Sequence, residues 1–185
     1  MNILNLKRGK MKKLLIIYGP RGGYTEHVAD TLKTELSKNF DAKSLPGTMV
    51  SSSTFNEYDN IIIGVATLGN DSWNAGRQDM DVNQIQVILN RFDFSRKKVA
   101  LFGLGNSILY PEHFCDDMGI IEDILQKKNA EIIGYTSTYD YSFKESKALR
   151  DNQLCGLALD NDTENEKTEA RISAWIDAVT IEFLK

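Results

Sequence analysis

Short uninterrupted runs of apolar residues alternate along this chain with longer segments in which apolar residues recur every three or four positions. The short runs are typical of strands buried on both faces, and the longer segments are typical of amphipathic helices. The predicted strands span residues 12–18, 60–65, 99–103, 131–135 and 156–159, with a short edge strand at 41–45. The predicted helices span residues 25–40, 84–92 and 168–184, and one more carries Phe114, Met118, Ile121 and Leu125 on one face. The alternation predicts an α/β fold, with a doubly wound parallel sheet between two layers of helices.

The length of 185 residues and the hydrophobic content of 42% suit one compact core. We therefore expect a single domain over residues 11–185. Residues 1–10 place Lys7, Arg8 and Lys10 after apolar positions, the reverse of the order in a secretory signal, and are predicted to be a flexible extension. No run is long enough to span a bilayer, so no membrane partner is expected.

The formal net charge is −4 and the isoelectric point is near 5.3. No basic stripe is present to neutralise a phosphate backbone, so nucleic acid binding is excluded. Cys115 and Cys155 stand far apart without a CxxC pair, and this spacing predicts neither a disulfide framework nor a metal site. Free cysteines suit the reducing cytoplasm, where we expect this protein to reside.

Residues 18–25 read Tyr-Gly-Pro-Arg-Gly-Gly-Tyr-Thr and connect the first strand to the first helix. A glycine-rich turn that opens a helix points several backbone N–H groups at one spot, at the positive end of the helix dipole, and therefore suits a phosphate. The alternative is a tight strand-to-helix turn without a ligand. This stretch alone supports the two interpretations equally.

Three loops leave the carboxyl ends of predicted strands, at residues 19–25, 66–80 and 104–111; we call them the first, second and third loops. Parallel sheets of this class bind ligands at these ends. Trp73 lies in the second loop, and Asn106 and Tyr110 lie in the third. A single loop aromatic is most often a packing anchor, but two that flank a phosphate turn can enclose a flat ring. The three loops together predict a planar, phosphate-bearing cofactor.

At these residues the sequence resembles the long-chain flavodoxins, from about residue 11 to residue 185. Residues 99–106, Val-Ala-Leu-Phe-Gly-Leu-Gly-Asn, with Tyr110, Phe114 and Gly119 after them, are similar to the third flavin loop of that family and its following helix. Residues 141–149, Tyr-Ser-Phe-Lys-Glu-Ser-Lys-Ala-Leu, and Gly-Leu-Ala-Leu-Asp at 156–160 are similar to the insertion that splits the last strand of long-chain members.

The resemblance implies a flavodoxin-like five-stranded parallel sheet in the order 2-1-3-4-5, with its last strand split and FMN at the switch point. It implies a monomeric, low-potential one-electron carrier and not an enzyme, docking transiently to redox partner proteins such as a flavodoxin/ferredoxin reductase. Trp73 and Tyr110 correspond to the residues that cover the two faces of the flavin ring. The cofactor-binding residues that it implies are Pro20, Arg21, Gly22, Gly23, Tyr24, Thr25, Thr67, Ser72, Trp73, Asn74, Ala75, Gly76, Leu104, Gly105, Asn106, Tyr110, His113 and Phe114.

The first loop departs from the family pattern Thr/Ser-x-Thr-Gly-x-Thr, since only Gly23 and Thr25 match it. Two hydroxyl donors and the N–H of residue 20 are missing. At about 1 kcal/mol each, these losses weaken FMN binding roughly a hundredfold unless the Arg21 guanidinium offsets them.

The second and third loops also differ from the family. The second is longer, so that either Thr67 or Ser72 takes the usual threonine position and either Leu68 or Trp73 faces the ring. In the third, Asn106 replaces a common aspartate, and its carbonyl can still accept from the flavin N3–H.

Two other functions share this fold: an FMN-dependent NAD(P)H:quinone reductase, and a binding module with weak or lost affinity for FMN. A P-loop hydrolase is excluded because no Gly-Lys-Ser/Thr follows the first loop. Glu112, Asp116 and Asp117 follow the third loop. We interpret them as solvated helix charge, with a docking surface for basic redox partners as the alternative.

Overall fold

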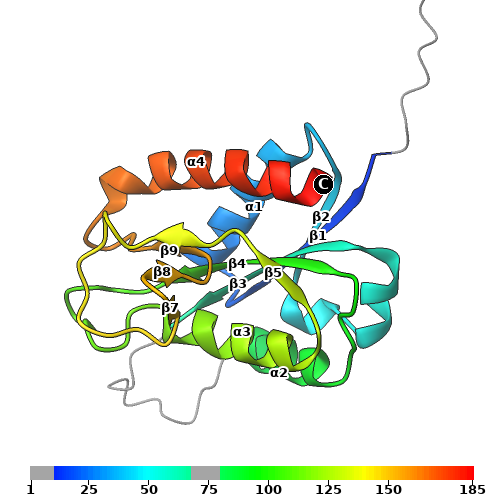
Figure 1. Cartoon of the computed structure of the whole chain (residues 1–185), viewed down its shortest axis with the longest axis horizontal. Helices are drawn as coiled ribbons and strands as arrows, with labels where there is room; N and C mark the ends of the chain where they lie inside the picture. The colour runs from blue at the N-terminus through cyan, green and yellow to red at the C-terminus, as the bar shows by residue number, and fades with distance from the viewer. Residues whose placement is uncertain (1–10, 68–79) are drawn as a thin grey trace, which may run out of the picture.

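A parallel sheet forms the centre of the computed structural model, which describes residues 11–67 and 80–185 (Figure 1). The predicted extension at residues 1–10 lies outside the described residues. The strands of the sheet are β1 (Lys13–Gly19), β2 (Asp41–Pro46), β3 (Asn60–Ala66), β4 (Lys98–Leu104), β5 (Glu131–Ile133) and β9 (Leu157–Leu159). The order β2-β1-β3-β4-β5 confirms the predicted fold.

Helices cover both faces of the sheet, with α1 and α4 on one side and α2 and α3 on the other (Figure 1). The helices are α1 (Tyr24–Leu36), α2 (Met80–Asn90), α3 (Asp116–Lys127) and α4 (Asn165–Leu184), with short 3₁₀ turns η1 (Gly47–Met49) and η2 (Ser52–Glu57) before β3. Among the described residues, no helix combines the length and the apolar character that crossing a membrane requires.

The predicted helix bounds differ from the observed ones mainly at the ends. Phe114 precedes α3 instead of lying within it, because Cys115 adopts the left-handed conformation (φ 55°) as the residue before the helix. Helix α1 ends at Leu36, and the chain makes a turn there before Phe40 packs into the core. Helix ends depend on local backbone geometry that apolar periodicity does not report.

The last position of the sheet is shared by β5 and β9, which both pair with β4. Ala100 of β4 is in register with Ile133, and Phe102 is in register with Leu157. Between these strands, residues 134–156 carry a small antiparallel sheet of β6 (Thr136–Ser137), β8 (Gln153–Leu154) and β7 (Leu149–Arg150). The predicted split of the last strand is therefore confirmed.

Glycine makes the return to the sheet possible. A Cβ atom at Gly156 would lie 2.2 Å from the carbonyl oxygen of Leu101, so any other residue would push the incoming strand away from β4. Similarly, a Cβ at Gly64 of β3 would lie 1.8 Å from the Phe102 ring. These close approaches fix the strands side by side, and their carboxyl ends consequently meet at one edge.

Candidate cofactor site

A cavity of about 320 Å³ lies at the carboxyl ends of β1, β3 and β4. The strand register explains the convergence, since Gly19 is level with Val65 and Ala66 is level with Leu104. The cavity is lined by Pro20, Gly23, Tyr24, Thr25, Ala66, Thr67, Leu104, Gly105, Asn106, Leu109, Tyr110, Asn161 and Asp162. The structure thus brings together residues of all three predicted loops.

The first loop leads directly into α1. Gly23 is the residue before the helix, and no side chain caps the helix start. The N–H groups of the first turn therefore remain available at the positive end of the helix dipole. Thr25 in this turn is 2% exposed, and Gly22 has φ 80°, which favours glycine.

Glu26 holds this loop in shape, although sequence reasoning missed it. Its Oε2 accepts the Gly22 N–H at 2.6 Å, and its Oε1 accepts the Tyr18 hydroxyl at 2.7 Å. The hydrogen bonds from Tyr18 and Gly22 lower the pKa of Glu26, whereas burial and the bond to Glu26 raise the pKa of Tyr18. The sequence spacing could have indicated this role, because a glutamate three residues after the residue that caps a helix often accepts a hydrogen bond from the backbone before the helix.

Arg21 does not line the cavity but forms a bidentate ion pair with Asp81 at the start of α2. Its Nε lies 2.9 Å from Oδ2 and its Nη2 lies 2.8 Å from Oδ1. The Asp81 side chain is 4% exposed and also accepts the Thr48 N–H at 2.9 Å. Hydrogen bonding to Arg21 lowers the pKa of Asp81 despite its burial. The phosphate contact expected of Arg21 stays a prediction.

The third loop is fixed by the end of β9. Asn106 Oδ1 accepts the Leu109 N–H at 2.7 Å, and its Nδ2 donates to Asp162 Oδ2 at 3.1 Å. The buried Asp160 carboxylate accepts the Ser107 N–H at 2.8 Å and the Ser107 hydroxyl at 2.7 Å. Burial opposes ionisation, but hydrogen bonds from Thr163 and Ser107 keep the pKa of Asp160 below its ordinary value. The Asn106 side chain is therefore occupied in holding the loop, and its role toward a flavin stays a prediction.

Several predicted site residues lie elsewhere. Phe114 is 1% exposed and stacks on Phe143, with ring centroids 5.3 Å apart. His113 Nδ1 lies 3.0 Å from Asp116 Oδ2, and neither His113 nor Phe114 lines the cavity. Gly22 shapes the first loop without lining the cavity. The predicted residues Ser72, Trp73, Asn74, Ala75 and Gly76, and the alternative Leu68, lie outside the described residues.

The cavity also contains residues that were not predicted, of which Asn161 and Asp162 are the most informative. They follow β9, whose carboxyl end lies at the same sheet edge as those of β1, β3 and β4. Asn161 Oδ1 accepts the Thr168 hydroxyl at 3.2 Å, and its buried Nδ2 has no partner within the described residues. The apolar run before Asp160 could have indicated that Asn161 and Asp162 lie at the site, since the residues that follow a strand of a parallel sheet lie at this edge.

Comparison with known proteins agrees with this geometry. The family model described as flavodoxin matches residues 16–175. A flavodoxin of a Nostoc species is 36% identical over 173 residues, covering 93% of this chain and 98% of that protein. The flavodoxin of Buchnera aphidicola is 37% identical over 174 residues, covering 91% and 96%. The chain belongs to the flavodoxin family.

Solved structures support the same assignment. Fusobacterium nucleatum flavodoxin bound to flavin mononucleotide superposes with a TM-score of 0.82 at 28% identity, covering 93% of this chain and 99% of that one. Flavodoxins are electron-transfer proteins and not enzymes, so the predicted family and the predicted electron carrier are confirmed, and the reductase alternative is not favoured.

In this flavodoxin, the acidic residues after the third loop are not equivalent. Asp116 is 6% exposed and accepts the Lys147 N–H at 2.8 Å. Burial raises the pKa of Asp117, and the nearby Asp116 adds to the effect. Glu112 is exposed and lies 3.4 Å from the Lys144 ammonium. The interpretation as solvated charge therefore suits Glu112, whereas Asp116 anchors the insertion.

Proposed function

We propose that this flavodoxin binds FMN non-covalently in the cavity at the carboxyl ends of β1, β3 and β4 and carries electrons singly between redox enzymes. The observation that carries the proposal is the convergence of an uncapped helix start and two further loops on one cavity. FMN-bound relatives with the same fold support it. FMN supplies the redox chemistry, and the protein binds it, orients it and limits its contact with water.

The start of α1 suits the phosphate. The first-turn N–H groups and the Thr25 hydroxyl supply neutral donors, and the dipole of this 13-residue helix adds partial positive charge. Pro20 has no N–H to offer. Among the described residues, no lysine or arginine lines the cavity, and the Arg21 guanidinium beside the loop is paired with Asp81. The described residues therefore offer a phosphate the neutral donors of the helix start.

The remainder of the cavity suits a flat ring. Tyr110 offers an aromatic face, and Leu104, Leu109 and Ala66 add apolar surface. Gly105 keeps the backbone close to Phe114 and Cys115, because a Cβ there would lie 2.8 Å from the Cys115 nitrogen. From the family resemblance we assign Trp73 and its neighbours in the second loop to the other ring face.

We also infer transient docking to redox partners such as a flavodoxin/ferredoxin reductase, a monomeric state and a cytoplasmic location. Both cysteines are buried and unpaired. Burial raises the pKa of the Cys115 and Cys155 thiols, so they stay protonated and inert.

Titration of the apoprotein tests the proposal. FMN fluorescence should be quenched with a clear endpoint, and riboflavin, which lacks the phosphate, should bind more weakly. We expect Thr25→Ala to weaken FMN binding about tenfold while riboflavin binding stays unchanged, since one charge-assisted hydrogen bond is lost. Thr34→Ala is the matched control, because the Thr34 hydroxyl bonds only its own helix, at 2.8 Å from the Asp30 carbonyl oxygen.

Two results would refute the proposal that this protein is an FMN-dependent electron carrier. An apoprotein that leaves FMN fluorescence unchanged would indicate a binding module without flavin. Steady oxidation of NAD(P)H by a quinone, with no reductase added, would indicate an enzyme.

A further inference from the structure

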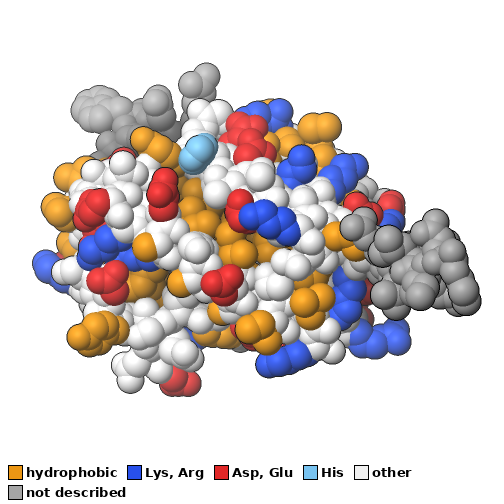
Figure 2. All heavy atoms as spheres, turned by 90° about the horizontal axis from the view of Figure 1, so that it is seen from above, with side chains coloured by type: hydrophobic (Ala, Val, Ile, Leu, Met, Phe, Trp, Pro, Cys, Tyr) orange, Lys and Arg blue, Asp and Glu red, His pale blue; other side chains and the backbone are white. Residues whose placement is uncertain are grey.

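A groove of about 710 Å³ lies between α1 and α4, compared with about 320 Å³ for the cofactor cavity. Figure 2 shows this face, where hydrophobic side chains lie in a hollow with both acidic and basic side chains around it. We propose that this groove, here called the α1–α4 groove, docks a basic amphipathic segment of the electron-transfer partner. The redox nature of the partner rests on the proposed function, whereas the chemistry of the segment rests on the groove itself.

The groove has an apolar floor and several carboxylates along its α4 side. Ile172 and Ile176 of α4 form part of the floor, and Glu166, Glu169 and Asp177 line its α4 side. No lysine or arginine of the described ranges lines it. An amphipathic segment with leucine-like and lysine-like positions matches this surface in both charge and hydrophobicity.

The three carboxylates on the α4 side of the groove have no ion-pair partner among the described residues. Within residues 11–67 and 80–185, Glu166, Glu169 and Asp177 form no ion pair, although Glu164, the residue before α4, binds Arg171 at 2.8 Å and Lys167 at 2.7 Å. Glu35, on the α1 side of the groove, is paired with Lys38. Glu166 and Glu169 are three residues apart on one helix face, a spacing at which like charges repel. A bound cation would relieve this repulsion, so the groove gains stability from a basic partner.

The α1–α4 groove adjoins the cofactor cavity. Tyr24 and Asn161 line both hollows, and Tyr24 is 54% exposed. A partner that occupies the groove therefore reaches the edge of the cavity, where an electron-transfer partner must come.

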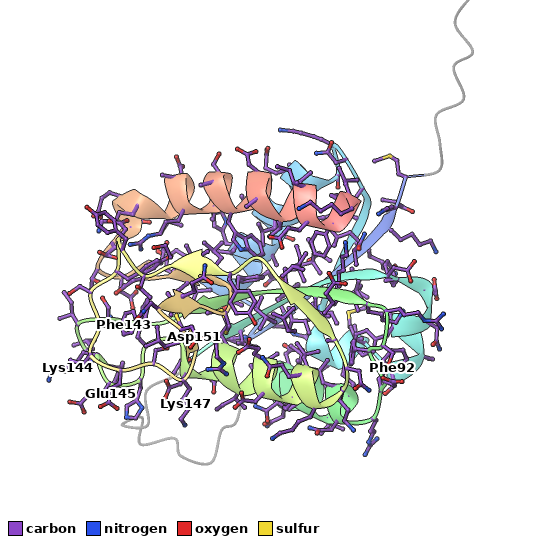
Figure 3. The ribbon with its side chains drawn as sticks, in the orientation of Figure 1. Phe92, Phe143, Lys144, Glu145, Lys147 and Asp151 are labelled. Carbon is purple, nitrogen blue, oxygen red and sulfur yellow. The ribbon has the colours of Figure 1, made fainter. Side chains whose placement is uncertain are left out.

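The acidic surface after the third loop is a weaker candidate. Figure 3 shows Lys144, Glu145 and Lys147 along the insertion, on the side of the molecule away from α4. Glu112 is paired with Lys144 and Asp116 is buried, so positive and negative charges are mixed there. This contrast supplies a matched control: Glu166→Lys with Glu169→Lys in the groove, against Glu112→Lys with Glu145→Lys at the insertion. Each pair replaces two carboxylates by two ammonium groups, so both variants have the same formal net charge.

The first measurement uses a fluorescein-labelled amphipathic helix of leucine and lysine as the probe, followed by anisotropy on the apoprotein and on the FMN-loaded protein. We expect the groove variant to bind the probe at least about tenfold more weakly, and the insertion variant to bind within about twofold of the parent. Equal losses in the two variants, or a loss in the insertion variant alone, would overturn the proposal. Because probe binding is also measured on the apoprotein, the docking proposal can be tested even if the protein fails to bind FMN. Unchanged FMN affinity in both variants verifies their folding.

The second measurement is the rate at which the reduced, FMN-loaded protein reduces cytochrome c, a basic acceptor. The parent rate should fall as salt rises, and the groove variant should be about tenfold slower and less sensitive to salt. The basic residues Lys7, Arg8 and Lys10 of this chain are an alternative occupant of the groove, and a variant without residues 1–10 tests them. If the probe binds this variant much more tightly than the parent, residues 1–10 occupy the groove and the proposed docking of a partner is refuted. A concentration-dependent dimer that excludes the probe would refute it equally.

Discussion

The ion pair between Arg21 and Asp81 joins the first loop to the start of α2, and its removal should cost measurable stability. Arg21→Ala removes two charge-assisted hydrogen bonds, each of about 1.5–3 kcal/mol, and leaves the Asp81 carboxylate nearly buried. The loss is moderated because the Arg21 side chain is 51% exposed and because Thr48 still donates to Asp81. We therefore expect the free energy of unfolding to fall by about 2 kcal/mol.

Urea unfolding of the apoprotein measures this loss, and a double-mutant cycle isolates the pair. The double variant Arg21→Ala with Asp81→Asn should lose about 1–2 kcal/mol less free energy of unfolding than the sum of the losses in the two single variants, because it buries no unpaired charge. Arg21→Lys is the control, since an ammonium keeps the charge but cannot form the bidentate contact. Additivity within about 0.5 kcal/mol would refute the reasoning.

The same pair predicts a pH dependence with a definite sign. The folded state lowers the pKa of Asp81, so its contribution is fully present above the pKa of a free aspartate, about 3.9, and is lost as the pH falls toward the lowered value. Below about pH 4 the parent should therefore lose stability faster than Asp81→Asn. A parallel decline of the two proteins would contradict this assignment.

The other predictions concern the return of the chain to the sheet and the third loop. Asp160→Ala should lower the free energy of unfolding by about 3 kcal/mol, because it leaves the N–H groups of Ser107 and Thr163 without an acceptor. The control Asp59→Ala, at a side chain that is 92% exposed, should change the free energy of unfolding by less than about 0.5 kcal/mol. Gly156→Ala should cost about 1–3 kcal/mol because its Cβ would meet the Leu101 carbonyl; an unchanged denaturation midpoint would show that β9 can shift without loss.

Much of this fold follows from local pattern alone. The apolar runs at residues 60–65 and 99–103 became β3 and β4 because strands buried on both faces need continuous apolar side chains. The glycine-rich first loop became the entry to α1, and the apolar run at residues 156–159 became a strand. These features depend on neighbours in the chain, which a sequence displays directly.

Residue partnerships across the chain were decided only by the tertiary structure. Arg21 finds Asp81 sixty residues away, and Phe114 stacks on Phe143 of the insertion instead of entering the cavity. Asn161 reaches the cavity because β9, and not β5, reaches the carboxyl end of β4. A side chain takes the partner that best satisfies its charge or apolar surface in three dimensions. The sequence therefore determined which loops meet, whereas tertiary contacts determined which side chains those loops leave available for a ligand.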